Sequence, residues 1–261
     1  MLTWLNHLDR ILRGEATKPD QLAGGTLNVP VFGLAVVIDV LGLIYGACMG
    51  LFSVMGHDTS RWLQIPASML KVPALFLLTL VITVPSLYTF NALVGSRLKM
   101  LPVIRLLTAS VAVMLAVLAS LGTIVAFFSV STTSYPFMVL LNVAVFAISG
   151  VLGLRFLLQT LHRMSVAAQG DSTPTGAGTP PALPVSVIPV TQSVKVVFRI
   201  WLIVFALVGA QMGWVLRPFI GDPNQPFTWL RPRQSNFFEA VGKNSARLMG
   251  VDEKWNQRLH R

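Results

Sequence analysis

Long uninterrupted apolar stretches dominate the pattern of hydrophobic and polar positions along this chain. Four of them cover residues 29–54, 72–95, 106–128 and 137–161, and a fifth covers 194–219. A helix needs about 20 apolar residues to cross roughly 30 Å of hydrocarbon, because each residue adds about 1.5 Å. The pattern therefore predicts an all-α, polytopic transmembrane helical bundle of five spans.

The third and fourth spans are separated by composition rather than by charge. Between Arg105 and Arg155 lie 49 consecutive residues without a charged residue or histidine. One helix of that length would extend about 74 Å, more than twice the thickness of a bilayer core. The polar, turn-forming run from Ser129 to Pro136 divides the stretch, which predicts a helical hairpin.

The polar ends of the chain each predict one short amphipathic helix. In the N-terminal segment 1–28, residues 2–13 place apolar side chains at helical spacing, so this helix lies either on the headgroup region or on the protein's own helices. In the C-terminal tail 220–261, Asn236 and Glu239 have the spacing of a capping box for a helix that ends near Gly250. Its basic flanks predict a surface helix or one that docks on a partner.

Residues 166–193 change character. Five prolines stand among Gly, Ser and Thr, which is typical of a linker between the fourth and fifth spans.

The composition is typical of a membrane protein, and the distribution of charge indicates which classes of partner it binds. Hydrophobic residues make up 54% and charged residues 11% of the chain, and its mean hydropathy is +0.68. The net charge of +10 comes mostly from residues beside apolar spans and in the last 45 residues. This distribution predicts anionic lipid headgroups as partners and no nucleic acid.

Basic residues predict the orientation. With the N-terminus in the cytoplasm, ten Lys and Arg residues lie on cytoplasmic segments and two, Arg61 and Lys71, on the first two external loops. The positive-inside rule favours this arrangement. Five spans then place the C-terminal tail outside with the remaining eight basic residues, which conflicts with the same rule. Orientation is set mainly by earlier segments, so we expect a cytoplasmic N-terminus and an external C-terminus.

Two prolines mark the second span. Pro73 suits the start of a helix, whereas Pro85 in the interior predicts a kink, with Thr83 or Ser86 helping to satisfy the freed backbone. In the first span, Gly42, Gly46 and Gly50 form overlapping GxxxG spacings, which favour ordinary close helix packing over a dedicated dimer face.

Asp39 is the sharpest single residue, because an ionisable group within a span is costly. It indicates either a proton or cation site or a structural aspartate, protonated or hydrogen-bonded, near one end of a tilted helix. Since no second charged group lies mid-span, the structural interpretation is favoured. The candidate intramembrane polar site comprises Asp39, Asn91, Asn142 and Gln211. Interhelical hydrogen bonding is the alternative explanation for the three amides.

The sequence contains no pattern typical of an active site. The four histidines fall in separate segments, and no zinc, nucleotide-binding or nucleophile motif is present. The single cysteine, Cys48, excludes an intrachain disulfide. We therefore expect no catalytic residues, no metal and no cofactor.

The exit from the fifth span is rich in proline, arginine and aromatic residues. It predicts either an interfacial belt that fixes the depth of the span or a docking surface for a partner. The candidate contacts are Trp214, Arg217, Pro218, Phe219, Phe227, Trp229, Arg231 and Arg233.

The order of a polar N-terminal segment followed by five spans resembles the Yip1-like family of polytopic membrane proteins. Its most suggestive part is the proline-bearing second span, KVPALFLLTLVITVPSLYTFNALVG; the DLYGP and GY-type signatures of the eukaryotic members are missing. The chain is also similar to bacterial inner-membrane proteins whose last span ends in WxLRPFxG, here Trp214 to Gly221. The first resemblance implies a membrane-organising or partner-recruiting protein and carries over no functional residues. The second implies a bacterial inner membrane.

These patterns predict a non-enzymatic scaffold or accessory subunit of a membrane assembly, with a membrane protein partner or a second copy of the chain. The alternative is a small transporter or channel that uses Asp39 and the span kinked at Pro85.

Overall fold

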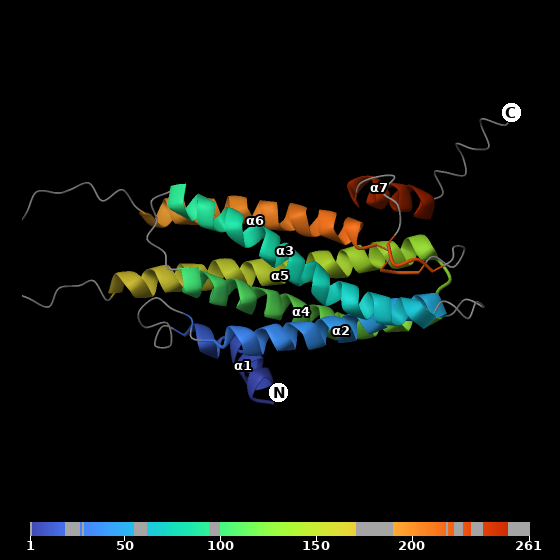
Figure 1. The fold of residues 1–261 in the computed structure, drawn as a ribbon, viewed down its shortest axis with the longest axis horizontal. Helices are drawn as coiled ribbons and strands as arrows, with labels where there is room; N and C mark the ends of the chain where they lie inside the picture. Colours follow the sequence, from blue (N-terminus) through green and yellow to red (C-terminus); the bar gives the residue numbers. More distant parts are fainter. Residues whose placement is uncertain are drawn as a thin grey trace, which may run out of the picture. The chain divides into compact units, whose positions relative to one another are not determined.

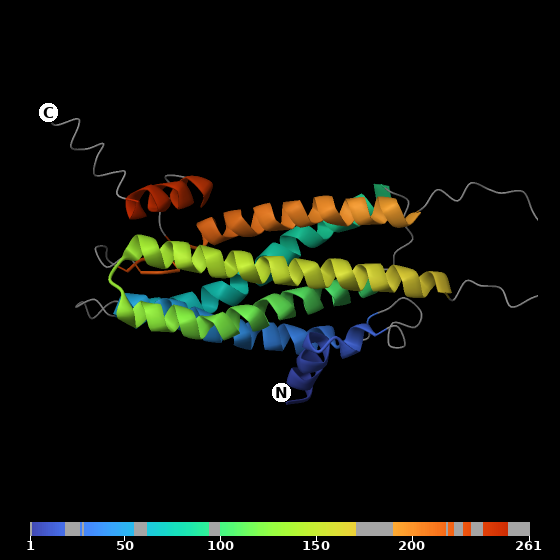
Figure 2. The ribbon, with the colours of Figure 1, turned by 180° about the vertical axis from the view of Figure 1, so that it is seen from behind.

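Helices form all the regular structure that the computed structural model describes. The described residues are 2–18, 27, 29–54, 62–93, 100–170, 190–217, 219–221, 227–230 and 237–249, and within them no strand is present. Side chains are described except at residues 2, 87, 90–93, 100, 164–170 and 190–199. The helices are α1 (Leu2–Leu12), the short 3-10 helix η1 (Glu15–Thr17), α2 (Val31–Val54), α3 (Gln64–Leu93), α4 (Met100–Ser131), α5 (Tyr135–Gly170), α6 (Val190–Val215) and α7 (Phe237–Leu248) (Figure 1, and from behind in Figure 2).

Four helices are long and apolar enough to cross a membrane. Their candidate spans are Val31–Val54, Gln64–Ser86, Leu101–Ser131 and Tyr135–Arg163. The shortest has 23 residues, or about 35 Å at 1.5 Å per residue, which exceeds the hydrocarbon thickness. The chain is thus an integral membrane protein. In α6 the apolar stretch with described side chains is the shorter segment Ile200–Val215.

The helices differ from the expected spans mainly at their ends. The second span is expected to start at Val72, but α3 begins at Gln64 and includes Pro66 in its first turn, where no hydrogen bond is lost. Pro73 consequently lies inside α3 and does not start it. The linker is expected over 166–193, whereas α5 continues to Gly170 and α6 begins at Val190; residues 171–189 lie outside the described residues.

The chain divides into two compact units, to each of which every long helix contributes. Unit 1 comprises Met1–Val37, Val81–Val113 and Gly153–Phe205, and unit 2 comprises Ile38–Leu80, Met114–Leu152 and Ala206–Arg261.

In unit 1, α1 packs its apolar side on the protein. Leu8 and Ile11 are buried, with only 5% and 1% of their surface exposed. The indole of Trp4 covers Gly33, where an added Cβ would come within 2.6 Å of the ring. Of the two surfaces considered for α1, its own protein therefore covers these three side chains, while Leu5 and Leu12 remain exposed.

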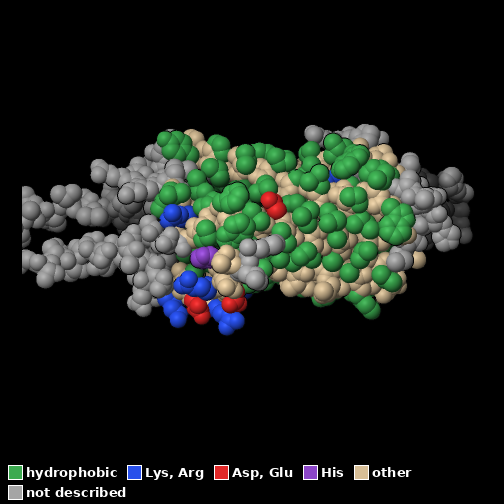
Figure 3. Space-filling model, turned by 60° about the horizontal axis from the view of Figure 1, so that its bottom comes forward, with side chains coloured by type: hydrophobic (Ala, Val, Ile, Leu, Met, Phe, Trp, Pro, Cys, Tyr) green, Lys and Arg blue, Asp and Glu red, His purple; other side chains and the backbone are tan. Residues whose placement is uncertain are grey.

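The polar side of α1 carries local ion pairs. Arg13 Nε lies 2.8 Å from Asp9 Oδ2, and Arg10 Nε lies 3.8 Å from Glu15 Oε2. The hydrogen bond to Asp9 raises the pKa of Arg13 above its ordinary value. Figure 3 shows such charged side chains gathered in one area of a face that is otherwise mostly hydrophobic.

Two longer-range contacts hold unit 1 together. Arg163 Nη1 donates to Thr17 Oγ1 at 2.9 Å, which joins the end of the fourth span to η1. The indole of Trp201 donates to the carbonyl of Thr83 at 2.9 Å, and Ser86 Oγ donates to the same carbonyl at 2.7 Å. These two donors serve the Thr83 carbonyl, whereas the carbonyl that loses its helical donor at Pro85 belongs to Val81.

In unit 2, glycines bring α2 and α3 into close contact along a single register. An added Cβ would come within 3.1 Å of Pro73 at Gly42, 2.6 Å of Met69 at Gly46 and 2.8 Å of Ile65 at Gly50. Each step of four residues along α2 matches a step of four back along α3, so the helices are antiparallel here. The GxxxG spacings serve packing within the chain.

Aromatic and polar side chains connect α2 to α5 in the same unit. Phe52 and Tyr135 lie with ring centroids 6.4 Å apart, and Tyr45 meets Phe146 edge to face at 5.5 Å. The start of α5 therefore lies at the end of α2, and these segments are also antiparallel.

Candidate functional site

The predicted intramembrane polar residues do not form one cluster among the described contacts. Tyr45 Oη donates to Asn142 Oδ1 at 2.8 Å, and Asn142 Nδ2 donates to the carbonyl of Met138 at 2.9 Å. Both Tyr45 and Asn142 are buried. Asn142 is therefore engaged in interhelical hydrogen bonding, as the structural interpretation of the amides expects.

Asp39 and Gln211 differ from Asn142. Each is half-buried, and no hydrogen bond or ion pair joins either side chain to the part of the chain that the structure describes. Asp39 lies on the side of α2 that also carries Gly46 and Gly50, since the three are separated by about whole turns. Asn91 belongs to α3, but its side chain lies outside the described residues.

The exit segment, defined as residues 216–230, follows α6 and is described at 216, 217, 219–221 and 227–230. Arg217 Cζ lies 3.7 Å from the ring centroid of Trp214, a cation–π contact. Phe227 and Trp229 meet edge to face at 6.0 Å. Of the predicted docking residues, Pro218, Arg231 and Arg233 lie outside the described residues.

Three side chains of α3 bind the backbone of the exit segment. Gln64 Nε2 donates to the carbonyl of Phe219 at 2.9 Å, and Ser68 Oγ donates to the same oxygen. Lys71 Nζ donates to the carbonyl of Trp229. The three residues, which we call the α3 polar row, occupy positions i, i+4 and i+7 and therefore share one face of the helix.

All three residues of the α3 polar row are almost fully buried. Gln64, Ser68 and Lys71 expose 2%, 0% and 4% of their surface. Buried donors without acceptors would be costly, and a buried ammonium even more so. The two exit carbonyls are thus part of what allows polar side chains to lie inside the first turns of a membrane helix.

Glycine permits the close approach of the exit segment to α2. An added Cβ on Gly221 would come within 2.6 Å of Ser53 Cβ and 3.3 Å of Gln64 Cγ. The neighbouring Ile220 is buried. The glycine of the WxLRPFxG string therefore has a steric role in this fold.

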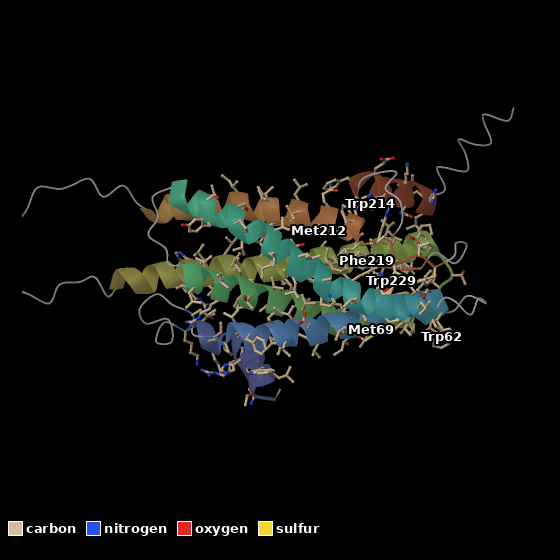
Figure 4. The ribbon with its side chains drawn as sticks, in the orientation of Figure 1. Trp62, Met69, Met212, Trp214, Phe219 and Trp229 are labelled. Atoms are coloured by element: carbon tan, nitrogen blue, oxygen red, sulfur yellow. The ribbon has the colours of Figure 1, made fainter. Side chains whose placement is uncertain are left out.

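The last part of α6 and the exit segment run along α3 in one direction. An added Cβ on Gly209 would lie 3.6 Å from Thr79, and one on Gly213 would lie 3.9 Å from Leu75. Phe219 continues this order by binding Ser68. Residues of α6 and of the exit segment thus pair with progressively earlier residues of α3, which is an antiparallel arrangement (Figure 4).

Outside these backbone contacts, large apolar side chains remain exposed. Trp62 and Leu63, which precede α3, are 63% and 53% exposed, and Trp229 and Leu230 are 54% and 58% exposed. Figure 4 labels Trp62 and Trp229 together with Met69, Met212, Trp214 and Phe219. Trp229 is therefore fixed through its backbone while its indole is available.

Sequence reasoning missed the α3 polar row. Lys71 is counted above as a basic residue of an external loop, but it is a buried residue of α3. The signal in the sequence for the α3 polar row was the spacing of Gln64, Ser68 and Lys71 at the start of an apolar run. The predicted contacts of the exit were all side chains, whereas the acceptors are backbone carbonyls, which every residue has.

Among the residues with described positions, no group of three or more His, Cys, Asp or Glu side chains could hold a metal ion. Comparison with protein-family models, with curated proteins and with solved structures finds no match to this chain. The resemblance to the Yip1-like family therefore stays a prediction.

Proposed function

We propose that this chain is a non-enzymatic, five-span membrane protein that acts as a scaffold or accessory subunit, and that its exit segment docks a membrane protein partner. The observation that carries the proposal is the α3 polar row, which binds the backbone of the exit segment while Trp229 and Leu230 stay exposed. A segment that is ordered before binding loses less conformational entropy on association.

An interfacial aromatic belt is the simpler explanation of the same residues. Tryptophans set the depth of a span through their side chains alone, because the indole prefers the headgroup region. Three buried donors on two backbone carbonyls are not needed for that purpose. Their presence favours a surface of defined shape.

The fifth span in this proposal is α6. It has 26 residues, or about 39 Å, which is enough to cross the hydrocarbon. Support comes from its antiparallel course along the candidate span of α3, with Gly209 beside Thr79 and Gly213 beside Leu75.

The proposed orientation keeps the N-terminus in the cytoplasm and the exit segment outside. The contact of Gly221 with Ser53 supports a common side for the exit segment and the connection between α2 and α3. The bacterial inner membrane is proposed from the resemblance that the WxLRPFxG string predicts. A C-terminal alkaline phosphatase fusion is expected to be active and a C-terminal fluorescent protein dark; the reverse result would overturn this topology.

The docking test compares Trp229→Ala with Phe238→Ala, since both replace exposed aromatic residues of the C-terminal region. The tagged full chain is purified in mild detergent, its co-purifying membrane protein is identified by mass spectrometry, and the two are reconstituted from pure components. Central aromatic contacts contribute about 2 kcal/mol or more, so Trp229→Ala is expected to weaken binding at least tenfold and Phe238→Ala to leave it unchanged. Recovery of the monomer alone, or equal effects of both variants, would contradict docking at the exit segment.

A small transporter or channel is the second candidate function. It is favoured by Asp39, whose side chain has no hydrogen bond or ion pair to the described residues and lies in the candidate span of α2. In that case Asp39→Asn abolishes coupled ion flux in proteoliposomes. If the protein is an accessory subunit, the same substitution leaves partner binding intact.

A further inference from the structure

The short helix α7 presents an apolar side that the described residues do not bury. Its helical positions place Phe237, Phe238, Val241, Leu248 and the following Met249 in one sector, and Glu239, Lys243 and Arg247 in the opposite sector. None of its residues is buried. Phe238, Leu248 and Met249 are 57%, 50% and 71% exposed.

Charge indicates what covers this side. Residues 231–261 contain seven Lys and Arg residues and three Asp and Glu residues, an excess of positive charge around α7. On α7 itself, Lys243 Nζ lies 2.6 Å from Glu239 Oε1, and Arg247 lies one turn further along the same sector. An amphipathic helix with basic flanks is complementary to an anionic lipid surface.

The length of the connecting segment also limits the distance between α7 and the bilayer. Lys71, which binds the Trp229 carbonyl, lies seven residues after Gln64, or about 10 Å along α3 from the start of its candidate span. Six residues connect Leu230 to Phe237, so the first residue of α7 lies within about 25 Å of Leu230, which follows the residue that Lys71 binds. The headgroup region is therefore always within its reach.

We propose that α7 binds the anionic surface of the bilayer that the chain spans. Its phenylalanine and leucine side chains enter the boundary between headgroups and acyl chains, and Lys243 and Arg247 face the headgroup phosphates. This inference is independent of docking at the exit segment, because it concerns different residues and a different ligand.

Hydrogen exchange of the full-length protein in nanodiscs tests the proposal. Exchange of amides 237–248 is compared between nanodiscs of phosphatidylcholine alone and nanodiscs that also contain phosphatidylglycerol. Each basic residue near an anionic surface contributes a factor of about five, so the anionic lipid is expected to slow exchange by about tenfold or more.

Two variants separate the apolar and the charged contribution. Phe238→Glu is expected to remove the protection in both lipids, and Lys243→Gln combined with Arg247→Gln to remove only the difference between the lipids. Gly242→Ala is the matched control, since an added Cβ there meets nothing within 4 Å and simply raises helix propensity. It is expected to slow exchange equally in both nanodiscs.

Three results would overturn the proposal. The first is equal exchange of α7 in the two lipids. The second is protection that requires two copies of the chain in one nanodisc, which would assign the apolar side to a second copy. The third is protection that requires the added partner of the exit segment, which would assign it to that protein. The thermal stability of Phe238→Glu in detergent should match the unsubstituted protein, which excludes a folding defect as the cause.

Discussion

The two ends of the chain carry helices of almost equal length, α1 with 11 residues and α7 with 12, and use them in opposite ways. Both are amphipathic. In α1, Leu8 and Ile11 are buried on the protein while Leu5 and Leu12 stay exposed, whereas α7 has no buried residue. The sequence pattern of an amphipathic helix therefore indicates that one side will leave water, but the surrounding protein decides what that side contacts.

Their attachments differ as well. The end of α1 is followed by η1, which Arg163 binds through Thr17. The last described attachment before α7 is the contact of Lys71 with the Trp229 carbonyl. Thus α1 is held through its own buried side chains and through η1, which follows it, and α7 is held through the segment that precedes it.

Ile11→Asp should cause the largest loss in the free energy of unfolding. A small loss would contradict the difference between α1 and α7. The substitution places a charge at a position with 1% exposure, which we expect to destabilise the protein by about 3 kcal/mol or more. Leu248→Asp at the half-exposed position on α7 is the matched variant, with an expected change below about 0.5 kcal/mol in detergent. Thermal unfolding followed by tryptophan fluorescence measures both.

Lys71→Met should remove the hydrogen bond to the Trp229 carbonyl while keeping an apolar side chain of similar length at position 71. A hydrogen bond from a charged donor contributes about 2 kcal/mol, so local opening of the exit segment should become about thirtyfold more frequent. Limited chymotrypsin cleavage at Phe227 and Trp229 is the measurement. Lys243→Met removes a cation that pairs within α7 and should leave the cleavage rate unchanged; an equal increase in both variants would show that Lys71 does not hold the segment.

Thr17→Val sharpens the comparison at the N-terminal end. It removes the hydroxyl that accepts from Arg163, and we expect a loss of about 1 kcal/mol in the free energy of unfolding. Ser245→Ala on α7 is its counterpart, since that hydroxyl donates only to Val241 of its own helix among the described contacts. The Ser245 variant should have the same free energy of unfolding as the unsubstituted protein.

Arg13→Gln should have the smallest effect, within the repeat error of the unfolding measurement, because the pair with Asp9 is exposed and screened by salt. The raised pKa of Arg13 means that its contribution is complete below the unfolded-state pKa and is lost only as pH rises through the folded-state value. Both pKa values lie far above neutral pH, so titration of Arg13 adds no pH dependence near neutrality. A clear change in stability on adding salt or on this substitution would contradict the prediction.

The sequence predicted the helical class and the location of four spans because apolar length is a strong signal. It placed the start of the second span at Val72 because Lys71 ends the uncharged run. A lysine can nevertheless be buried in the first turns of a membrane helix when its ammonium finds an acceptor, and that acceptor lies on Trp229, 158 residues away. Local patterns do not contain such a contact.

The candidate site was predicted in part for a related reason. The aromatic and basic side chains of the exit were visible in the sequence, and so was the tail helix. The carbonyl of Phe219 was not, because its role depends on which donors the fold brings to it. Likewise Asn142 and Asp39 look alike as polar residues within spans, and only the fold distinguishes the one that is hydrogen-bonded to Tyr45.

The glycine register between α2 and α3 has a consequence for biosynthesis. Its contacts join neighbouring spans, from Gly50 with Ile65 to Gly42 with Pro73, so this hairpin can close as soon as both helices have left the ribosome. The α3 polar row is then already in place but must wait for Phe219, which is 155 residues beyond Gln64. Until the exit segment is made, these side chains lack the carbonyls of Phe219 and Trp229, so the packing of the start of α3 is completed only after α6 has been synthesised.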